Sequence, residues 1–183
     1  MKSRMDEFAE WGTEVVFGRA HGFRAWMMRC LLRFASFFFY LLVKTRLFLF
    51  TRRIKTVRYL GTFVISVGNI TAGGTGKTPV VEFLSRALSA RGRKCAILTR
   101  GYKSEPLDEP QHWLDAEGKE VKHLPKIASD GVTRYLSPLY AGDEPFMLAR
   151  NLDGVAVLVD KDRVKSGIFA IEQLGSNTLI LDD

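Results

Sequence analysis

The hydrophobic positions of this chain follow two patterns, one in each part of the sequence. Residues 1 to about 60 carry long apolar stretches interrupted by single basic residues, which is typical of an amphipathic helical arm. From residue 61 on, short apolar runs rich in β-branched residues alternate with stretches of helical periodicity. This alternation predicts an α/β domain over residues 61–183, with a mostly parallel sheet and flanking helices.

Four apolar runs predict the strands of this sheet, and helical spacing predicts the segments between them. Strands are expected at residues 62–67, 94–99, 155–159 and 178–181, and helices at residues 77–91 and 162–174. Because the first two strands flank one helix, we expect them to form a parallel pair with a right-handed crossover. Residues 103–130 are polar and rich in turn-forming residues, so we expect mainly loops there.

The segment from Phe63 to Pro79 reads FVISVGNITAGGTGKTP and contains the parts of a phosphate-binding loop in order. Glycines let successive backbone N–H groups cradle phosphate oxygens, and the N-terminus of the following helix adds the positive end of its dipole. Lys77 would reach the β- and γ-phosphates of a nucleotide, and the Thr78 hydroxyl would bind Mg²⁺. The predicted nucleotide-binding residues are Thr71, Ala72, Gly73, Gly74, Thr75, Gly76, Lys77 and Thr78.

This loop departs at one position from the pattern G-x-x-x-x-G-K-[ST], since Thr71 stands at the first glycine position. The alternative interpretation is a glycine-rich turn before a helix that happens to carry a lysine. The order of strand, loop, Lys-Thr pair and helix favours nucleotide binding over that alternative.

The formal net charge of +7 is concentrated in the first part of the chain. No Asp or Glu occurs between Val15 and Val81, whereas basic residues recur throughout this stretch. It includes the apolar run from Phe34 to Val43, which is about half of the ~20 residues that a transmembrane helix needs. We therefore expect a basic amphipathic helix lying on an anionic membrane surface, and no nucleic acid partner. A buried core helix with peripheral charges is the alternative.

Two acidic segments are candidates for binding Mg²⁺ or for acid–base chemistry. Asp143 and Glu144 precede Pro145 where a helix should begin; they are either a helix N-terminal signal or groups aimed at Mg²⁺ or a substrate hydroxyl. Asp182 and Asp183 follow the last apolar strand, where a carboxylate commonly holds Mg²⁺ beside a phosphate loop. Since neither a loop nor a helix follows these aspartates, we expect the chain to be an N-terminal fragment of a longer protein.

Five motifs occur in a fixed order: VGNITAGGTGKTPVV at 67–81, LTRGY at 98–102, AGDEP at 141–145, DR at 162–163 and LDD at 181–183. Together they resemble the tetraacyldisaccharide 4′-kinase family, whose phosphate loop also lacks the first glycine. The resemblance implies a P-loop NTPase-like fold. It also implies ATP- and Mg²⁺-dependent phosphorylation of the 4′-hydroxyl of a tetraacylated disaccharide 1-phosphate, a lipid A precursor. The site of action would be the cytoplasmic face of the inner membrane, with residues 1–60 as a peripheral or monotopic arm.

The same resemblance implies roles for single residues. Asp143 would help to activate the attacking hydroxyl, and Lys77 is the second expected catalytic residue. The expected metal ligands are Thr78, Glu144, Asp182 and Asp183, of which the two aspartates match the start of a family element DDG-x-QH. The rest of that element and the family's C-terminal half are missing from this sequence, so the chain alone is expected to be inactive.

Two other functions compete with a lipid kinase. A membrane-associated ATPase with a K-G-G-T-G-K-T loop is disfavoured by Ala72, which stands where that class has its signature lysine. A non-enzymatic module that binds membranes is favoured by the basic arm but not by the phosphate loop.

Overall fold

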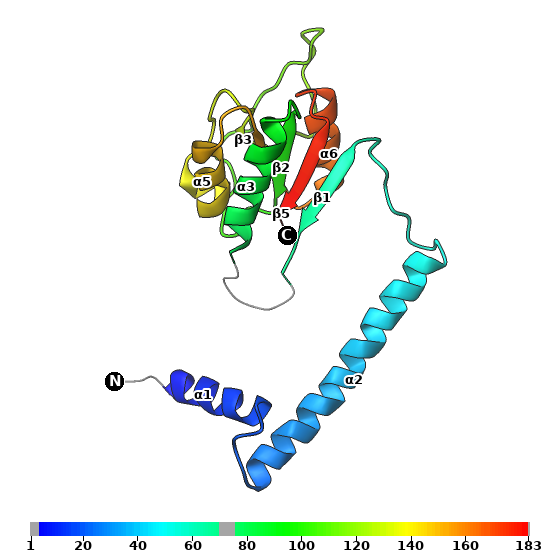
Figure 1. Ribbon diagram of the computed structural model, residues 1–183, viewed down its shortest axis with the longest axis vertical. Helices are drawn as coiled ribbons and strands as arrows, with labels where there is room; N and C mark the ends of the chain where they lie inside the picture. The colour runs from blue at the N-terminus through cyan, green and yellow to red at the C-terminus, as the bar shows by residue number, and fades with distance from the viewer. Residues whose placement is uncertain (1–3, 70–75, 183) are drawn as a thin grey trace. The chain divides into compact units, whose positions relative to one another are not determined.

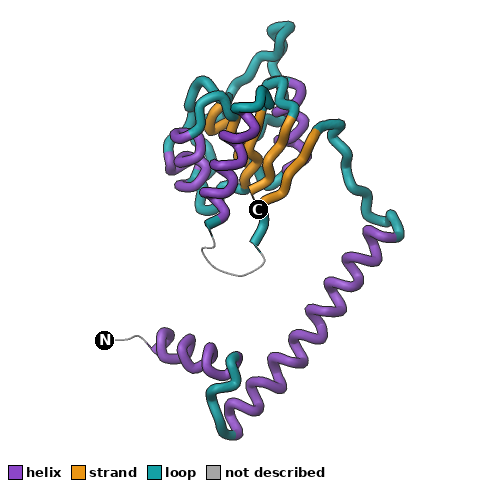
Figure 2. The backbone as a smooth tube through the Cα atoms, in the orientation of Figure 1, coloured by secondary structure: helices purple, strands orange, loops and turns teal. Residues whose placement is uncertain are grey.

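The computed structural model describes residues 4–69 and 76–182 of the chain. The chain forms two compact units, Met1–Val57 and Arg58–Asp183 (Figure 1, Figure 2). The first unit contains α1 (Arg4–Val16) and α2 (Phe23–Thr51). The second unit contains β1 (Phe63–Val67), α3 (Lys77–Ser89), β2 (Cys95–Thr99), β3 (Lys126–Ser129), α4 (Pro138–Ala141), α5 (Asp143–Asn151), β4 (Ala156–Val159), α6 (Arg163–Glu172) and β5 (Thr178–Asp182).

The predicted helical arm consists of two helices joined by a short turn. Val15 near the end of α1 and Ala25 near the start of α2 are buried. Arg29 of α2 donates hydrogen bonds to the carbonyl oxygens of Val15 (3.3 Å) and Ala20. The first of these hydrogen bonds ties the end of α1 to α2, and the second ties the connecting turn to α2.

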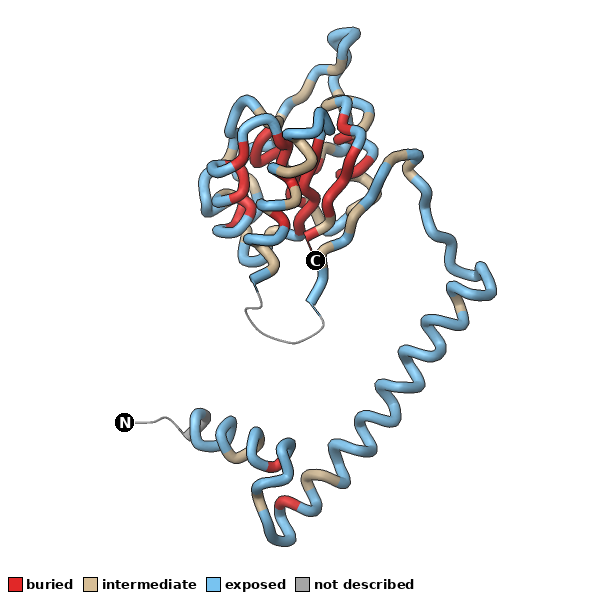
Figure 3. The backbone as a smooth tube through the Cα atoms, in the orientation of Figure 1, coloured by how far each residue is buried: buried red, intermediate tan, exposed pale blue. Residues whose placement is uncertain are grey.

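Helix α2 is uninterrupted over 29 residues, and almost all of its residues are exposed within the described chain (Figure 3). By length and composition it is the one described helix that could cross a membrane, with a mean hydropathy of 1.5 in its apolar window. The helix is longer than the apolar run from Phe34 to Val43 because it continues through Arg33 and Lys44, and the expected interfacial helix stays a prediction. Core helices and signal sequences can have the same length and composition, so membrane association of α2 stays a prediction.

A five-stranded sheet in the order β1-β5-β2-β4-β3 forms the centre of the second unit. The pairs β1·β5, β5·β2 and β2·β4 are parallel, and β3 pairs antiparallel with β4 at one edge. The register aligns Ile65 and Ile97 with Ile180, one from each neighbouring strand. The predicted mostly parallel sheet with flanking helices is confirmed.

Two features of the sheet differ from the sequence-based expectation. Strands β1 and β2 run in the same direction but do not pair, since β5 lies between them. The segment expected to be a loop contains β3, where Ile127, Ala128 and Ser129 are buried. The Gln111 side chain accepts a hydrogen bond from the N–H of Ile127 (2.7 Å) and donates one to its C=O (3.0 Å). It thereby satisfies backbone groups of this edge strand. Tertiary contacts thus stabilise a strand too short for a clear sequence pattern.

Alternate residues along the strands enter two apolar clusters, one on each face of the sheet. In β2, Cys95 and Ile97 belong to the cluster beneath α3 and α5, whereas Ala96 and Leu98 belong to the cluster that includes Phe169 of α6. Helices cover both faces accordingly (Figure 1). Because both faces are buried, strands of such a sheet need apolar residues at every position, which explains the continuous apolar runs.

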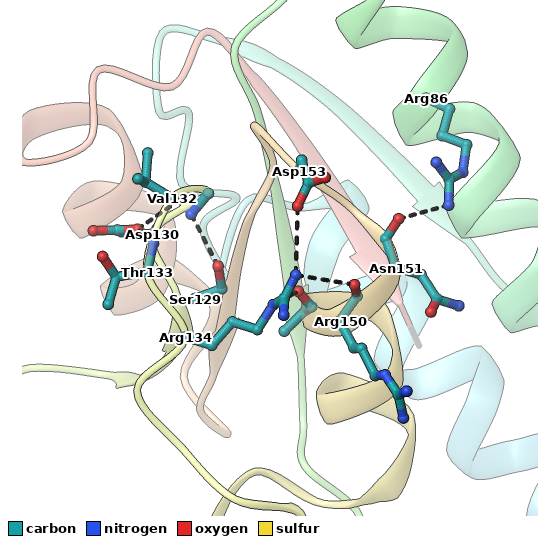
Figure 4. Close-up of polar contacts among 11 residues, drawn as sticks. Arg86, Ser129, Asp130, Val132, Thr133, Arg134, Arg150, Asn151 and Asp153 are labelled. Atoms are coloured by element: carbon teal, nitrogen blue, oxygen red, sulfur yellow. Dashed lines mark hydrogen bonds and ion pairs between the residues drawn. The ribbon is translucent and has the colours of Figure 1, made fainter.

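Two arginines bind the carbonyl groups at the C-terminal end of α5 (Figure 4). Arg134 donates to the carbonyl oxygens of Ala149 (3.0 Å) and Arg150 (3.2 Å), and Arg86 of α3 donates to that of Asn151 (2.6 Å). These carbonyl groups are the ones that a helix leaves without internal partners, and positive charge suits this end of the helix dipole. Arg86 and Arg134 therefore fasten α5 to α3 and to the segment after β3.

Candidate functional site

The carboxyl ends of the parallel strands meet at one edge of the sheet, where open α/β sheets bind ligands. In register, Val67 of β1 lies beside Asp182 of β5, and Asp182 lies beside Thr99 of β2. Thr99 in turn lies beside Val159 of β4. The segments that follow these strands, including the predicted phosphate loop and the Arg-Gly-Tyr turn at 100–102, therefore start from this edge.

A lysine and an aspartate predicted for different tasks are brought together here. Helix α3 begins at Lys77, directly after Gly76, which has the left-handed φ of 77° that glycine accommodates. The Lys77 Nζ lies 3.8 Å from Oδ1 of Asp182. The Asp182 side chain is only 3% exposed and that of Lys77 is 25% exposed. The ammonium thus lies on the solvent side of a nearly buried carboxylate, at the helix end where phosphates bind.

Several predicted site residues lie outside the described part of the chain. These are the loop residues Thr71, Ala72, Gly73, Gly74 and Thr75 and the aspartate Asp183. Their roles stay predictions from the sequence. Thr78, the predicted magnesium ligand that follows Lys77, is half-buried in the first turn of α3.

The other two predicted acids, Asp143 and Glu144, lie on α5, whereas Lys77 lies on α3 and Asp182 on β5. Asp143 and Glu144 are exposed in the first turn of α5, whose N-cap residue Gly142 supplies no side-chain hydrogen bond. Among the residues that the structure describes, no group of three or more His, Cys, Asp or Glu side chains is placed to hold a metal. A Mg²⁺ ion typically uses one or two protein carboxylates and completes its shell with phosphates and water. Asp182 with the Thr78 hydroxyl matches that smaller donor set.

A close backbone contact joins the 100–102 turn to the start of α5. A Cβ atom on Gly142 would lie 3.0 Å from the carbonyl oxygen of Tyr102, and one on Gly101 would overlap Cγ1 of Val159. Both glycines have positive φ, 67° at Gly101 and 90° at Gly142. Only glycine fits such positions without strain. The Arg-Gly-Tyr and Gly-Asp-Glu-Pro motifs are thus neighbours in space, and Asp143 is the residue next to the contact.

An open cleft of about 990 Å³ lies beside this contact. Its charged lining consists of the basic side chains Arg100, Lys103, Lys126, Lys161 and Lys165 and the acidic side chain Asp160. Tyr102 also lines it. An excess of positive charge along a concave surface attracts anions, so the cleft suits a ligand that carries phosphate.

The sequence pattern singled out Arg100 and Tyr102 but missed the lysines of this cleft. Lys161 comes just after the carboxyl end of a buried strand, where open α/β sheets bind ligands, so its position in the sequence could have marked it as a site residue. Lys126 could not be found in the same way, because the strand that it begins was not predicted. Burial lowers the pKa of the Lys126 ammonium below its ordinary value, and the negative charge of Asp160 partly offsets this effect.

Local contacts at the start of α6 explain the Asp-Arg motif. Asp162 is the N-cap residue, and its carboxylate accepts hydrogen bonds from the N–H groups of Val164 (2.9 Å) and Lys165 (3.1 Å). Arg163 donates to the carbonyl oxygen of Asp160, and Lys165 forms an ion pair with the Asp160 side chain. These contacts fix the end of β4 relative to α6 and orient one wall of the cleft.

A family model described as LpxK, Tetraacyldisaccharide-1-P 4'-kinase, matches residues 28–183. The chain belongs to this family. The Tetraacyldisaccharide 4'-kinase of Geobacter sulfurreducens is 39% identical over 166 residues, which are 91% of this chain and 43% of that protein. The corresponding protein of Syntrophus aciditrophicus is 46% identical over 120 residues, or 66% of this chain and 28% of that protein.

A crystal structure of LpxK from Aquifex aeolicus, the "apo" form in complex with ATP, has a similar fold. Its TM-score is 0.66 at 31% sequence identity, over 85% of this chain and 44% of that one. The chain thus spans less than half the length of these LpxK relatives. Membership of the family, inferred from the five motifs, is confirmed.

Proposed function

We propose that this chain is the nucleotide-binding part of an ATP-dependent lipid kinase that phosphorylates the 4′-hydroxyl of a tetraacyldisaccharide 1-phosphate in lipid A biosynthesis. The observation that carries the proposal is the 3.8 Å approach of Lys77 Nζ to Asp182 Oδ1 at the carboxyl ends of β1 and β5. A cation at a helix N-terminus beside a carboxylate is the arrangement that nucleotide phosphates and their metal ion require. The names of the LpxK relatives and the ATP in the Aquifex complex support the same reaction.

Phosphoryl transfer depends mainly on positioning and charge neutralisation. The Lys77 ammonium would neutralise charge on the β- and γ-phosphates, while the N–H groups of the loop at 71–76 would hold them. Asp143 would accept the proton of the 4′-hydroxyl. Its exposed position at the start of α5 leaves its carboxylate accessible to a substrate.

Magnesium is the proposed metal of this site. Asp182 and Thr78 would hold it, with Glu144 and Asp183 as the further ligands predicted from the sequence. When bound with ATP, Mg²⁺ neutralises charge on the phosphates as the phosphoryl group is transferred.

We also propose that residues 1–60 form a membrane-associating arm and residues 61–183 the kinase domain. Helix α2 carries exposed aromatic side chains, and basic groups lie over several of them: Lys44 over Tyr40, Arg46 over Phe50 and Arg52 over Phe48. Side chains of both kinds are favoured at a membrane interface, where the apolar part enters the acyl region and the charge meets anionic headgroups. The proposed location is the cytoplasmic face of the inner membrane, with peripheral or monotopic attachment.

The direct test uses ATP labelled at its γ-phosphate, tetraacyldisaccharide 1-phosphate as acceptor, and the full-length protein that contains this chain. Appearance of the label in the lipid, dependent on Mg²⁺, is the expected result. Release of inorganic phosphate with no labelled lipid would favour a membrane-associated ATPase instead. Failure to bind ATP would favour the non-enzymatic membrane-binding module.

A further inference from the structure

We infer that Lys126 is a positioning residue of this site: its ammonium group holds the 100–106 loop against the α4–α5 junction and thereby places Asp143. The inference rests on the proposed function for the role of Asp143. It concerns a residue that no sequence motif of the chain includes.

The Lys126 ammonium binds three acceptors from two separate segments. Its Nζ donates to Ser104 Oγ (3.2 Å) and to the carbonyl oxygen of Glu105 (2.5 Å), both in the loop after β2. It also donates to the carbonyl oxygen of Tyr140 in α4 (3.2 Å). An ammonium group has three N–H donors, so this set uses its full hydrogen-bonding capacity. The lysine thus joins the loop to α4 by charge-assisted hydrogen bonds, which are stronger than neutral ones.

The direction of β3 explains why this lysine reaches the functional edge. Lys126 is the first residue of β3 and pairs with Val159, the last residue of β4. Because β3 is antiparallel to β4, its first residue lies at the carboxyl ends of the parallel strands. The side chain then lines the basic cleft together with Arg100 and Tyr102.

Further contacts connect the same two segments, so displacement of one would displace the other. The N–H of Glu105 donates to the carbonyl oxygen of Leu139 in α4 (2.9 Å). A Cβ on Gly101 would lie 3.3 Å from the carbonyl oxygen of Ala141, and Gly142 is in similar contact with Tyr102. Asp143 follows Gly142 directly in the chain. The loop and the junction therefore pack as one surface, and Lys126 supplies its charged link.

The ammonium of Lys126 is partly buried, so these contacts take the place of water around it. Burial of the ammonium disfavours the charged form and lowers its pKa, an effect that Asp160 partly offsets. Hydrogen bonds compensate the hydration that a partly buried ammonium loses, and the three acceptors of Lys126 supply them. Removing the ammonium would leave the carbonyl oxygens of Glu105 and Tyr140 without this donor, and the loop would be free to separate from α4.

The test compares Lys126→Met, which keeps the length of the side chain but has no donor, with Lys126→Gln, whose amide can still donate. Lys122→Met, at an exposed position of the same segment, is the matched control. In the full-length protein, kcat for lipid phosphorylation should fall about tenfold to a hundredfold in Lys126→Met, the loss expected when a reacting group is misplaced by about 1 Å. The Kd for ATP should stay within about twofold, since Lys77 and Asp182 are untouched. Lys126→Gln should recover part of kcat.

Hydrogen exchange supplies a second measurement that needs no activity. Amides in peptides covering 100–106 and 138–147 should exchange faster in Lys126→Met than in the Lys122→Met control, while those of β2 and β4 should not change. Unchanged exchange in both peptides would overturn the inference, as would faster exchange with unaltered kcat. If the wild-type protein phosphorylates no lipid, the proposed function fails, and the exchange data still decide whether Lys126 holds the junction. Should Lys126→Met not fold, the same comparison is made with Lys126→Gln.

Discussion

The carbonyl oxygen of Tyr102 lies against Gly142 so closely that a Cβ atom on this glycine would be 3.0 Å from it. Gly142 is also the N-cap residue of α5, with φ 90° and ψ 155°. This backbone conformation is essentially restricted to glycine. The contact therefore holds together two motifs that are distant in the sequence, and it lies next to Asp143.

Replacing Gly142 by alanine should damage both stability and catalysis. Backbone strain of this type costs on the order of 1 to 3 kcal/mol, and the added methyl group would push Tyr102 away from α5. Urea unfolding and kcat measure the two effects. Gly118→Ala is the control, because Gly118 also has positive φ (78°) but open space around its Cα. Equal losses of kcat in the two variants would show that the contact has no role in catalysis.

Lys77→Met should abolish phosphoryl transfer in the full-length protein while leaving it folded. The substitution removes a cation expected to contact the transferring phosphoryl group, and such a loss typically raises the barrier by about 2 to 4 kcal/mol. Turnover of the lipid substrate is compared with that of Lys119→Met, which removes a lysine from an exposed turn. Circular dichroism checks the fold. Full turnover by Lys77→Met would exclude the assigned phosphate site.

Asp143→Asn should lower kcat far more than it weakens ATP binding. Asparagine keeps the size of the side chain, but it can neither accept the hydroxyl proton nor bind a metal ion as well. Single-turnover kinetics and equilibrium ATP binding separate the two effects. Equal losses in both would make Asp143 a metal-binding or helix-terminal residue, and unchanged kcat would remove it from the site.

The turn after β3 should make stability depend on pH in the acid range. Asp130 accepts hydrogen bonds from the N–H groups of Val132 (2.8 Å) and Thr133 (2.6 Å) (Figure 4). It also accepts one from the Tyr135 hydroxyl (2.8 Å). Burial raises the pKa of Asp130, but these hydrogen bonds together outweigh burial and hold its pKa below the ordinary value. A carboxyl group with a lowered folded-state pKa contributes stability above its unfolded-state pKa of about 3.9, and loses it as the pH falls through the folded-state value.

The free energy of unfolding of the wild type should therefore exceed that of Asp130→Asn at neutral pH, and the difference should shrink below about pH 4. Urea unfolding at a series of pH values measures this. The control is Glu109→Gln at an exposed position, which should change the profile little. A difference between wild type and Asp130→Asn that is constant with pH would contradict the prediction.

The arm should bind anionic bilayers through an apolar and an electrostatic contribution. Each basic residue near such a surface adds about 1 kcal/mol, so cosedimentation with liposomes should weaken with added salt and with removal of anionic lipid. Serine at Phe37, Phe38 and Phe39, which are all exposed, should weaken binding even at low salt, because only the apolar contribution is reduced. Val132→Ser, at an exposed apolar position of the second unit, is the control. Binding that ignores both lipid charge and these aromatic side chains would argue against a membrane arm.

The parallel strands could be predicted from local sequence alone. Runs such as KCAILT and VAVLV predict β2 and β4 because a strand buried on both faces needs apolar side chains at consecutive positions. Strand β1 and helix α3, which flank the predicted phosphate loop, were predicted in the same way from their own residues. These features are local, so neighbouring residues are sufficient to specify them.

The order of the strands and the set of side chains that share the cleft depend on contacts between distant segments and could not be predicted locally. Strand β5 lies between β1 and β2, and β3 forms the edge of the sheet opposite to β1. Both placements depend on pairing between segments far apart in the chain. Lys126 reaches the functional edge because β3 runs antiparallel to β4, a direction that no local pattern encodes. The contact of Gly142 with Tyr102 arises in the same way, since packing free energy is gained between surfaces that meet only after the chain has folded.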